Sequence, residues 1–264
     1  TVMSQKYLGD NFDIHGGGLE NAFPHHECEI AQAEAHTDKA FANYWLHNNM
    51  VTINGQKMGK SLGNGIFCHE LFSGDNFQLD RAYSPMTVRF FILQSHYRST
   101  LDFSNEALEA ASKGLDRLQK GVLRLENLKA SNNSTIDVKA FEDELYQAMN
   151  DDFNSPIAIA KLFDGLKWIA ALEKGDERLT EKDLAHFKKT YHTFYFDILG
   201  LKMEKNEGTK NEVLDDVMQL VLAFRKAAKE QKDYATADQI RDKLKALKIA
   251  VKDSKDGAEW HFED

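Results

Sequence analysis

The chain has 264 residues, 42% of them apolar and 28% charged, a composition that excludes fibrous and disordered proteins and allows two or more globular domains. Its net charge of −9 argues against a protein that binds nucleic acid through general positive charge, so any RNA contact must be local. Two cysteines cannot build a disulfide framework, and no secretory signal or membrane-spanning apolar run is present, so we expect a cytoplasmic protein.

Residues 1–65 have the pattern of an α/β unit. The stretch NFDIHGGG at 11–18 is typical of a short strand that ends in glycines, and PHHECEIAQAEAHTDKAF after it has helical spacing with Pro24 in the first turn. Farther along, Asn54-Gly55 directly after VTI predicts a hairpin turn. The order strand, loop, helix and strand indicates an α/β layer architecture.

Residues from about 68 to 247 are expected to be mainly helical. Pro85 and Pro156 each follow a serine, and we place both at helix starts. Ser104 is the expected N-cap of a long helix, because the residues after it repeat apolar side chains at helical spacing. We therefore predict helices that pack against one another through their apolar faces.

One face of this long helix carries a basic stripe, formed by Lys113, Arg117, Lys120 and Arg124. The common origin of such a stripe is a helix face in contact with solvent. The alternative is a track for the phosphates of an RNA backbone.

Two polar stretches, 130–137 and 202–212, divide the helical region into blocks. After the second stretch, residues 212–231 and 234–248 have the spacing of two amphipathic helices. Residues 249–262 have the pattern of two short strands around Asp256-Gly257. We therefore expect the last part of the chain to be a small α+β module.

Two features near the first expected strand could bind ligands. His25 and Glu29 are four residues apart, so on a helix they would share one face and could bind one metal ion. Such a pair is more often a surface interaction, and no second pair of comparable spacing supplies the three or four ligands of a zinc site. Gly16-Gly17-Gly18 lacks the spacing of a dinucleotide fold but falls between a strand and a helix, where ligands gather in α/β sheets.

The stretch Lys57-Met58-Gly59-Lys60-Ser61 places two ammonium groups on a loop that contains glycine. Such a loop suits a triphosphate whose negative charge shifts toward a leaving pyrophosphate. The alternative is an ordinary basic surface loop.

Taken in order, the stretches FDIHGGG, FPHHECEIAQ, YWLHN, KMGKSLGN, SHYRSTLDFS, DDFNSPIAIAKLF and ADQIRDKLKAL resemble those of cysteinyl-tRNA synthetases, a family of class I aminoacyl-tRNA synthetases. KMGKS resembles the KMSKS loop of that family, with Gly59 at the usual serine. The glycine removes a hydroxyl group and adds backbone freedom to a loop that must close on ATP.

The resemblance assigns roles to individual residues. It implies that Lys57 and Lys60 are catalytic and that both bind ATP together with Ser61. It also implies that His15, Gly16, Gly17 and Gly18 border the pocket for cysteine and its adenylate.

A zinc ion is the cofactor that the resemblance implies. In the family it is held by two cysteines, the first histidine of the HH pair and the last acid of HHxxE, which correspond here to His25 and Glu29. Zinc binds a thiolate far better than a hydroxyl, so it distinguishes cysteine from serine. The second cysteine ligand of the family comes immediately before a stretch like TVMS, and the first lies with the HIGH motif farther upstream. Cys28 is not expected to be a ligand.

The resemblance implies a mixed, mainly α fold in four parts. These are a C-terminal portion of a Rossmann-like nucleotide-binding catalytic domain (1–66), a stem-contact segment (67–130), a DALR-like helical bundle (131–205) and an anticodon-binding α+β module (206–264). The expected tRNA-binding residues of the last part are Lys229, Tyr234, Asp238, Asp253 and Trp260. Aromatic rings can stack on anticodon bases and carboxylates can accept hydrogen bonds from base amino groups. The alternative for Tyr234 and Trp260 is packing within the module.

The implied function is ATP-dependent ligation of cysteine to its tRNA through a cysteinyl adenylate, with magnesium accompanying the ATP. The partners would be cysteine, ATP and the tRNA for cysteine, in a monomeric enzyme without membrane contact. Because the HIGH-containing half is not in this sequence, we expect that the chain alone does not activate cysteine. One alternative is the cysteine ligase of mycothiol biosynthesis, which needs no anticodon module. The other is a non-catalytic, tRNA-binding helical fragment.

Overall fold

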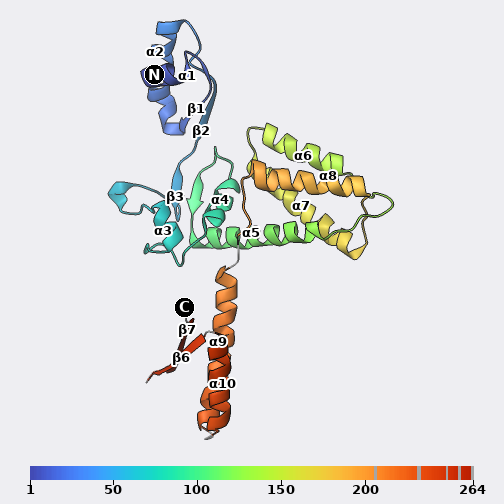
Figure 1. Ribbon diagram of the computed structural model, residues 1–264. Helices are drawn as coiled ribbons and strands as arrows, with labels where there is room; N and C mark the ends of the chain where they lie inside the picture. The colour runs from blue at the N-terminus through green and yellow to red at the C-terminus, as the bar shows by residue number, and fades with distance from the viewer. Residues whose placement is uncertain (205–206, 231–232, 248, 255–256, 263–264) are drawn as a thin grey trace. The chain divides into compact units, whose positions relative to one another are not determined.

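The computed structural model describes residues 1–204, 207–230, 233–247, 249–254 and 257–262, and for some of these only the backbone (Figure 1). The chain divides into two units, Thr1–Met203 and Glu204–Asp264. Helices dominate the described residues, and the strands form small sheets of two or three strands. This confirms the expected class, mainly α with a partial α/β portion.

The α/β unit begins the first unit. Helix α1 (Val2–Leu8) is followed by β1 (Phe12–Gly18), the short turns η1 (Leu19–Asn21) and η2 (Ala22–His26), helix α2 (Glu27–Thr37) and β2 (Ala42–Asn48). Strands β1 and β2 pair in parallel, with His15 opposite Trp45 and Gly17 opposite His47. A parallel pair needs a crossover connection, which α2 provides. The predicted order of strand, helix and strand is confirmed.

Helix α2 starts later than the sequence indicates. Helical spacing predicts a start at Pro24, but the regular helix begins at Glu27. Phe23 has φ −137° and ψ 135°, an extended conformation that the residue before a proline favours. His25 therefore lies in the irregular turn η2, whereas Glu29 lies in the first turn of α2.

A three-stranded sheet follows, in the order β4-β3-β5. Strands β3 (Val51–Ile53) and β4 (Gln56–Lys57) form the predicted hairpin, whose turn residues Asn54 and Gly55 have φ of 50° and 76°. Strand β5 (Leu101–Phe103) pairs in parallel with β3 and was not predicted, because a three-residue strand has too few residues to show a period.

The side chain of Asp102, on β5, binds both β3 and the turn between β3 and β4. The Oδ1 atom of Asp102 accepts hydrogen bonds from the Thr52 hydroxyl at 2.6 Å and the Gly55 N–H at 2.8 Å. These two hydrogen bonds hold the pKa of Asp102 below its usual value. The carboxylate therefore links the hairpin turn to β5, about fifty residues farther along the chain.

The remainder of the first unit is helical. After the turn η3 (Lys60–Leu62) come α3 (Cys68–Ser73), α4 (Pro85–Leu93), α5 (Asn105–Glu126), α6 (Val138–Asn150), α7 (Ser155–Lys174), α8 (Glu181–His192) and the turn η4 (Thr193–Ile198). The side chains of Ser84 and Ser104 accept hydrogen bonds from the N–H groups of Thr87 and Ala107, which confirms two predicted starts. The third predicted helix start, at Pro156, agrees with the structure to within one residue, because Pro156 occupies the first turn of α7.

Helices α3 to α8 of the first unit share one hydrophobic core. Figure 1 shows α6, α7 and α8 stacked beside the long helix α5. In the centre of the bundle the ring of Phe187 packs against those of Phe141, Trp168 and Tyr191, with centroids 5.4–6.1 Å apart. Offset and edge-on ring contacts of this kind add to the free energy gained by burial.

The basic stripe of α5 is neutralised by neighbouring side chains. Lys113 and Lys120 pair with acidic residues one turn earlier on the same helix, and Arg124 pairs with Glu173 of α7. The Arg117 guanidinium lies over the ring of Phe163 at 5.4 Å. These contacts favour the interpretation as a helix face over that of a phosphate track.

The second unit contains α9 (Glu207–Glu230), α10 (Tyr234–Ala246), β6 (Ile249–Ser254) and β7 (Gly257–Phe262). The two strands pair antiparallel, with Val251 opposite Trp260. Met218, Leu244 and Ile249 form its buried core. The predicted module of two helices and two strands is confirmed.

The ring cluster gives a stability prediction. We expect Phe187→Ala to lower the free energy of unfolding by about 3–5 kcal/mol, because the lost ring leaves a cavity among aromatic neighbours. The matched control is Phe77→Ala, whose side chain is 86% exposed and should change stability by less than about 0.5 kcal/mol. Denaturant unfolding of both variants measures the difference, and equal losses would contradict this account of the core.

Candidate functional site

The end of β1 makes a close contact with a buried histidine. A Cβ atom at Gly17 would lie 2.7 Å from Cε1 of His26, whereas one at Gly16 would meet nothing closer than 3.6 Å. The His26 side chain is held against the strand and is only 4% exposed. Gly17 is therefore required by the approach of the imidazole ring to the backbone.

His26 belongs to a cluster of aromatic rings above the β1–β2 pair. Its Nδ1 atom lies 2.8 Å from Nε2 of His47, in a hydrogen bond whose donor depends on the tautomers. The ring of His15 lies edge-on to that of His26 at 4.9 Å and 4.6 Å from that of Trp45. Burial lowers the pKa of His26, and the nearby His15 and His47 lower it further, which favours a neutral imidazole.

Glu29 of α2 faces this cluster. Its Oε2 atom lies 2.9 Å from Nε2 of His15. The orientation is not that of a hydrogen bond, and this buried oxygen has no hydrogen-bond partner among the described residues. Its Oε1 atom lies 3.8 Å from the backbone nitrogen of Thr1. Glu29 is therefore a half-buried carboxylate whose buried Oε2 atom has unused acceptor capacity.

Three of these side chains form a set of metal donors. His15, His26 and Glu29 each offer one ligand atom, and these atoms lie within 4.8 Å of one another. Nitrogen and oxygen donors of this kind suit zinc. The histidine named by the sequence analysis, His25, has an exposed side chain and is not in this set. Cys28 is also exposed.

The lysine loop, which we define as residues 57–64, follows strand β4. The side chains of Lys57 and Ser61 are exposed. The side chain of Lys60 lies outside the described part of the structure. A Cβ atom at Gly59 would meet no atom closer than 3.9 Å, so the backbone here could carry the serine that is usual in the KMSKS motif.

The expected tRNA-binding residues lie in the second unit. Tyr234, at the start of α10, is 63% exposed. Asp238 is also exposed and lies 3.2 Å from Arg241, whereas Lys229 is half-buried. Trp260 of β7 packs against the small core. Asp253 lies in β6, but its side chain is outside the described residues.

Sequence reasoning missed part of the histidine cluster. His26 and His47 were not singled out, although both occur in stretches that carry the family resemblance. Their contact joins residues 21 positions apart, so no local spacing indicates it. The available signal was the run of glycines in β1, which marks a strand that another group approaches closely.

Three family models match the chain in order. The class I (C) catalytic domain of tRNA synthetases matches residues 1–113, the DALR domain matches residues 144–204, and the anticodon-binding domain of cysteinyl-tRNA ligase matches residues 213–260. The relatives include cysteine–tRNA ligases of Parabacteroides distasonis, 53% identical over 261 residues, and Porphyromonas gingivalis, 52% identical over the same length. Both alignments cover 98% of this chain and 53% of the relative.

The chain belongs to the cysteinyl-tRNA synthetase family. It spans about half the length of the curated family members that it matches. A more distant family member, the cysteine–tRNA ligase of Chlorobium chlorochromatii, is 47% identical over 266 residues.

A solved structure supports the class I fold of this cysteinyl-tRNA synthetase chain. The Agrobacterium radiobacter K84 agnB2 LeuRS, in a ternary complex with tRNA and LeuAMS, matches 72% of the chain with a TM-score of 0.50. The match covers 27% of that protein at 16% identity, so it bears on the fold alone. Among the described residues, no helix combines the length and apolarity needed to cross a bilayer.

The contact between Gly17 and His26 gives the second prediction. We expect Gly17→Ala to displace the His26 ring, weaken its contact with His47 and cost about 1–3 kcal/mol of stability. The pKa of His26 should then rise toward the ordinary histidine value of 6.5, because the ring becomes more solvated. Gly16→Ala is the matched control.

The pH dependence has a defined sign. Because the pKa of His26 is lower in the folded than in the unfolded protein, protonation opposes folding, and stability falls as pH drops below about 6.5. This loss should be smaller in Gly17→Ala. Titration of the imidazole protons by NMR, together with unfolding curves at several pH values, measures both effects. An unchanged His26 titration in Gly17→Ala would refute the packing argument.

Proposed function

We propose that this chain supplies the second part of the catalytic domain and the tRNA-binding domains of an enzyme that ligates cysteine to its tRNA through a cysteinyl adenylate. The observation that carries the proposal is the order of its parts. A βαβ unit with a histidine and glutamate cluster comes first, followed by an exposed lysine loop, a helical bundle and a module that matches an anticodon-binding domain.

In this proposal the lysine loop binds the phosphates of Mg-ATP. Lys57 lies at the end of a two-residue strand, where its exposed ammonium group can meet negative charge that develops toward pyrophosphate. Lys60 and Ser61 would contribute from the following turn, η3. His15 and Gly16-Gly17-Gly18 on β1 would border the cysteine and adenylate pocket. Catalysis would then rest on positioning and charge rather than on a covalent protein intermediate.

A zinc ion would occupy the region around Glu29, and His25 and Glu29 are the ligands that we propose from this chain. The fit rests on the buried Oε2 atom of Glu29, which lacks a hydrogen bond among the described residues. When bound, zinc supplies a position that selects a thiolate over a hydroxyl. His15 and His26 are the alternative imidazole ligands, because their donor atoms already lie close to Glu29.

We propose the four parts with the boundaries 1–66, 67–130, 131–205 and 206–264, as catalytic portion, stem-contact segment, DALR-like bundle and anticodon-binding module. The exposed Tyr234 and Asp238 suit contacts with unstacked anticodon bases. Lys229, Asp253 and Trp260 would complete the tRNA-binding set. We further propose a monomeric cytoplasmic enzyme.

One alternative activity is transfer of activated cysteine to an amino sugar, as in mycothiol biosynthesis. That reaction has no use for an anticodon-binding module, whereas residues 213–260 match one. A tRNA-binding protein without catalysis is the other alternative. The lysine loop argues against it, because a helical tRNA-binding fragment needs no phosphate loop.

Cysteine-dependent exchange of pyrophosphate into ATP tests the activity. We expect exchange in a full-length synthetase that contains this sequence and none above background in residues 1–264 alone. Lys57→Ala should lower the exchange rate constant of the full-length enzyme by about 100-fold or more, because it removes a positive charge that stabilises the leaving pyrophosphate.

The matched control is Lys139→Ala, which removes a surface lysine of α6 that pairs with Glu142 and Asp143. It should leave exchange unchanged. Full exchange in Lys57→Ala would refute the role of the lysine loop, and exchange by residues 1–264 alone would refute the division of the catalytic domain.

Metal content tests the zinc ligands. We expect His25→Ala and Glu29→Gln, each in the full-length synthetase, to reduce bound zinc well below one ion per chain, since each removes one ligand. His69→Ala, which truncates an exposed histidine of α3, is the matched control. Elemental analysis after dialysis gives the result. Loss of zinc in His26→Ala with retention in His25→Ala would assign the ion to His15, His26 and Glu29.

A further inference from the structure

We propose that Asn64 and Gln78 are positioning residues that hold the lysine loop in place and connect it to the start of α5. This inference rests on the proposed function, because it assigns the two amides a role in placing Lys57 for the reaction with ATP. Neither residue lies in the KMGKS stretch, and both are half-buried.

Asn64 closes the loop on itself. Its Nδ2 atom donates to the carbonyl oxygen of Lys57 at 3.1 Å, and its Oδ1 atom accepts from the N–H of Gly59 at 2.9 Å. One donor and one acceptor are needed at once, which a carboxamide supplies and a carboxylate does not. The side chain thereby fixes the backbone on both sides of Met58.

The middle of the loop is the turn η3, closed by the backbone hydrogen bond from the Leu62 N–H to the Gly59 carbonyl oxygen at 3.0 Å. Gly63 adopts φ +61°, and a Cβ atom there would meet nothing within 4 Å. Gly59 is similarly open. The loop therefore combines a base held by Asn64 with glycines at 59 and 63, which give the backbone the conformational freedom that a loop closing on a nucleotide requires.

Gln78 holds Asn64 from outside the loop. Its Nε2 atom donates to the Asn64 carbonyl oxygen at 3.0 Å. The Gln78 carbonyl oxygen in turn accepts from Nδ2 of Asn105, the first residue of α5, at 3.0 Å. The Oδ1 atom of Asn105 accepts from the N–H of Asp80 at 3.1 Å. These side-chain amides link the loop to α5 by successive hydrogen bonds.

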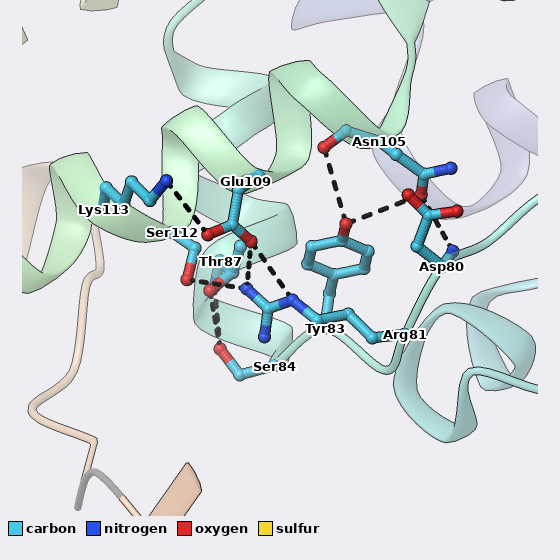
Figure 2. Close-up of polar contacts among 9 residues, drawn as sticks. All are labelled: Asp80, Arg81, Tyr83, Ser84, Thr87, Asn105, Glu109, Ser112 and Lys113. Atoms are coloured by element: carbon cyan, nitrogen blue, oxygen red, sulfur yellow. Dashed lines mark hydrogen bonds and ion pairs between the residues drawn. The ribbon is translucent and has the colours of Figure 1, made fainter. Parts of the chain in front are cut away.

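The segment that carries Gln78 is itself fixed to α5 (Figure 2). Both Nε and Nη2 of Arg81 donate to Oε2 of Glu109, at 3.1 and 2.6 Å. The Tyr83 ring lies beneath the Arg81 guanidinium at 4.7 Å and is 3% exposed. An arginine that makes two hydrogen bonds to one carboxylate oxygen and stacks on a buried ring has little freedom. The segment between α3 and α4 therefore connects the loop to helix α5, which anchors it.

The first test measures exchange kinetics in the full-length synthetase. We expect Asn64→Ala to lower kcat for cysteine-dependent pyrophosphate exchange roughly 10-fold, because two hydrogen bonds that place Lys57 are lost, with KM for cysteine unchanged. Asn64→Asp should not restore activity, since it cannot donate to the Lys57 carbonyl. Gln78→Ala should have a smaller effect in the same direction.

The matched control is Asn127→Ala. This exposed amide at the end of α5 also donates to a backbone carbonyl, that of Leu123, at 2.9 Å, and it has no contact with the loop. The control and Asn64→Ala should have similar melting temperatures. An unchanged kcat in Asn64→Ala, or an equal loss in Asn127→Ala, would overturn the proposal.

A double-mutant cycle separates positioning from general damage. If Asn64 acts through Lys57, adding Asn64→Ala to Lys57→Ala should cause little further loss of exchange. Independent, multiplying losses would refute a role through Lys57.

A second measurement does not depend on activity. Trypsin cleaves after lysine, and the carbonyl group at the Lys57–Met58 bond is the one that Asn64 holds. We expect faster cleavage after Lys57 in Asn64→Ala than in the wild type or Asn127→Ala, because the open loop is more populated. Equal rates of cleavage after Lys57 in all three proteins would refute the claim that Asn64 holds the loop, even if the enzyme is active. A wild type without exchange would instead refute the proposed function, and cleavage would still decide the role of Asn64.

Discussion

Strand β3 is the element on which the arrangement of the first unit depends. On one edge it pairs with β4, which leads directly into the lysine loop, and on the other with β5, which leads into α5. The Asp102 carboxylate fixes both pairings, because it binds Thr52 on β3 and the hairpin turn at Gly55. The ionised carboxylate accepts both hydrogen bonds, and these hydrogen bonds lower the pKa of Asp102. The position of the loop is therefore set by residues that the chain brings together from about fifty positions apart.

A different constraint shapes the β1–β2 pair. The absence of a side chain at Gly17 lets a buried imidazole lie against the strand, and burial favours its neutral form. A neutral imidazole is the form that binds a metal ion, and a hydrogen bond through one ring nitrogen orients the other. Were His26 the ligand, as in the alternative set, its contact with His47 would supply that orientation. The carboxylate of Glu29 lies beside the rings, so one acid donor and two imidazole donors lie within 4.8 Å of one another.

Local signals predicted much of this fold. The caps at Ser84 and Ser104 and the hairpin turn at Asn54-Gly55 depend on residues within three positions of one another, so the sequence states them directly. The late start of α2 was a local effect that was overlooked, since Phe23 precedes a proline. Strand β5 was beyond local reasoning, because only its pairing with β3 makes those three residues a strand.

The candidate site was less accessible from sequence than the fold. Spacing could place His25 and Glu29 four residues apart, but the ring that lies against β1 is that of His26. Its contacts come from β1, which precedes α2 in the chain, and from β2, which follows it. Asn64 ends the KMGKSLGN stretch that carries the resemblance, but neither it nor Gln78 could be assigned a role from sequence, because the partners of an amide in a polar loop are not indicated by spacing. Family resemblance indicates which lysines would meet the nucleotide in the proposed function, whereas only the hydrogen bonds show that Asn64 holds the backbone at Lys57 and Gly59.

The basic side chains of α5 are poorly placed to attract an RNA backbone. The basic side chains along α5 are already engaged with acids or an aromatic ring, so a phosphate would have to displace an intramolecular partner to bind there. With a net charge of −9, long-range attraction cannot compensate for that loss. In the proposed function, recognition of tRNA by this chain would therefore rest on local contacts. The exposed ring of Tyr234 provides one suitable surface, because stacking on a base needs no net positive charge.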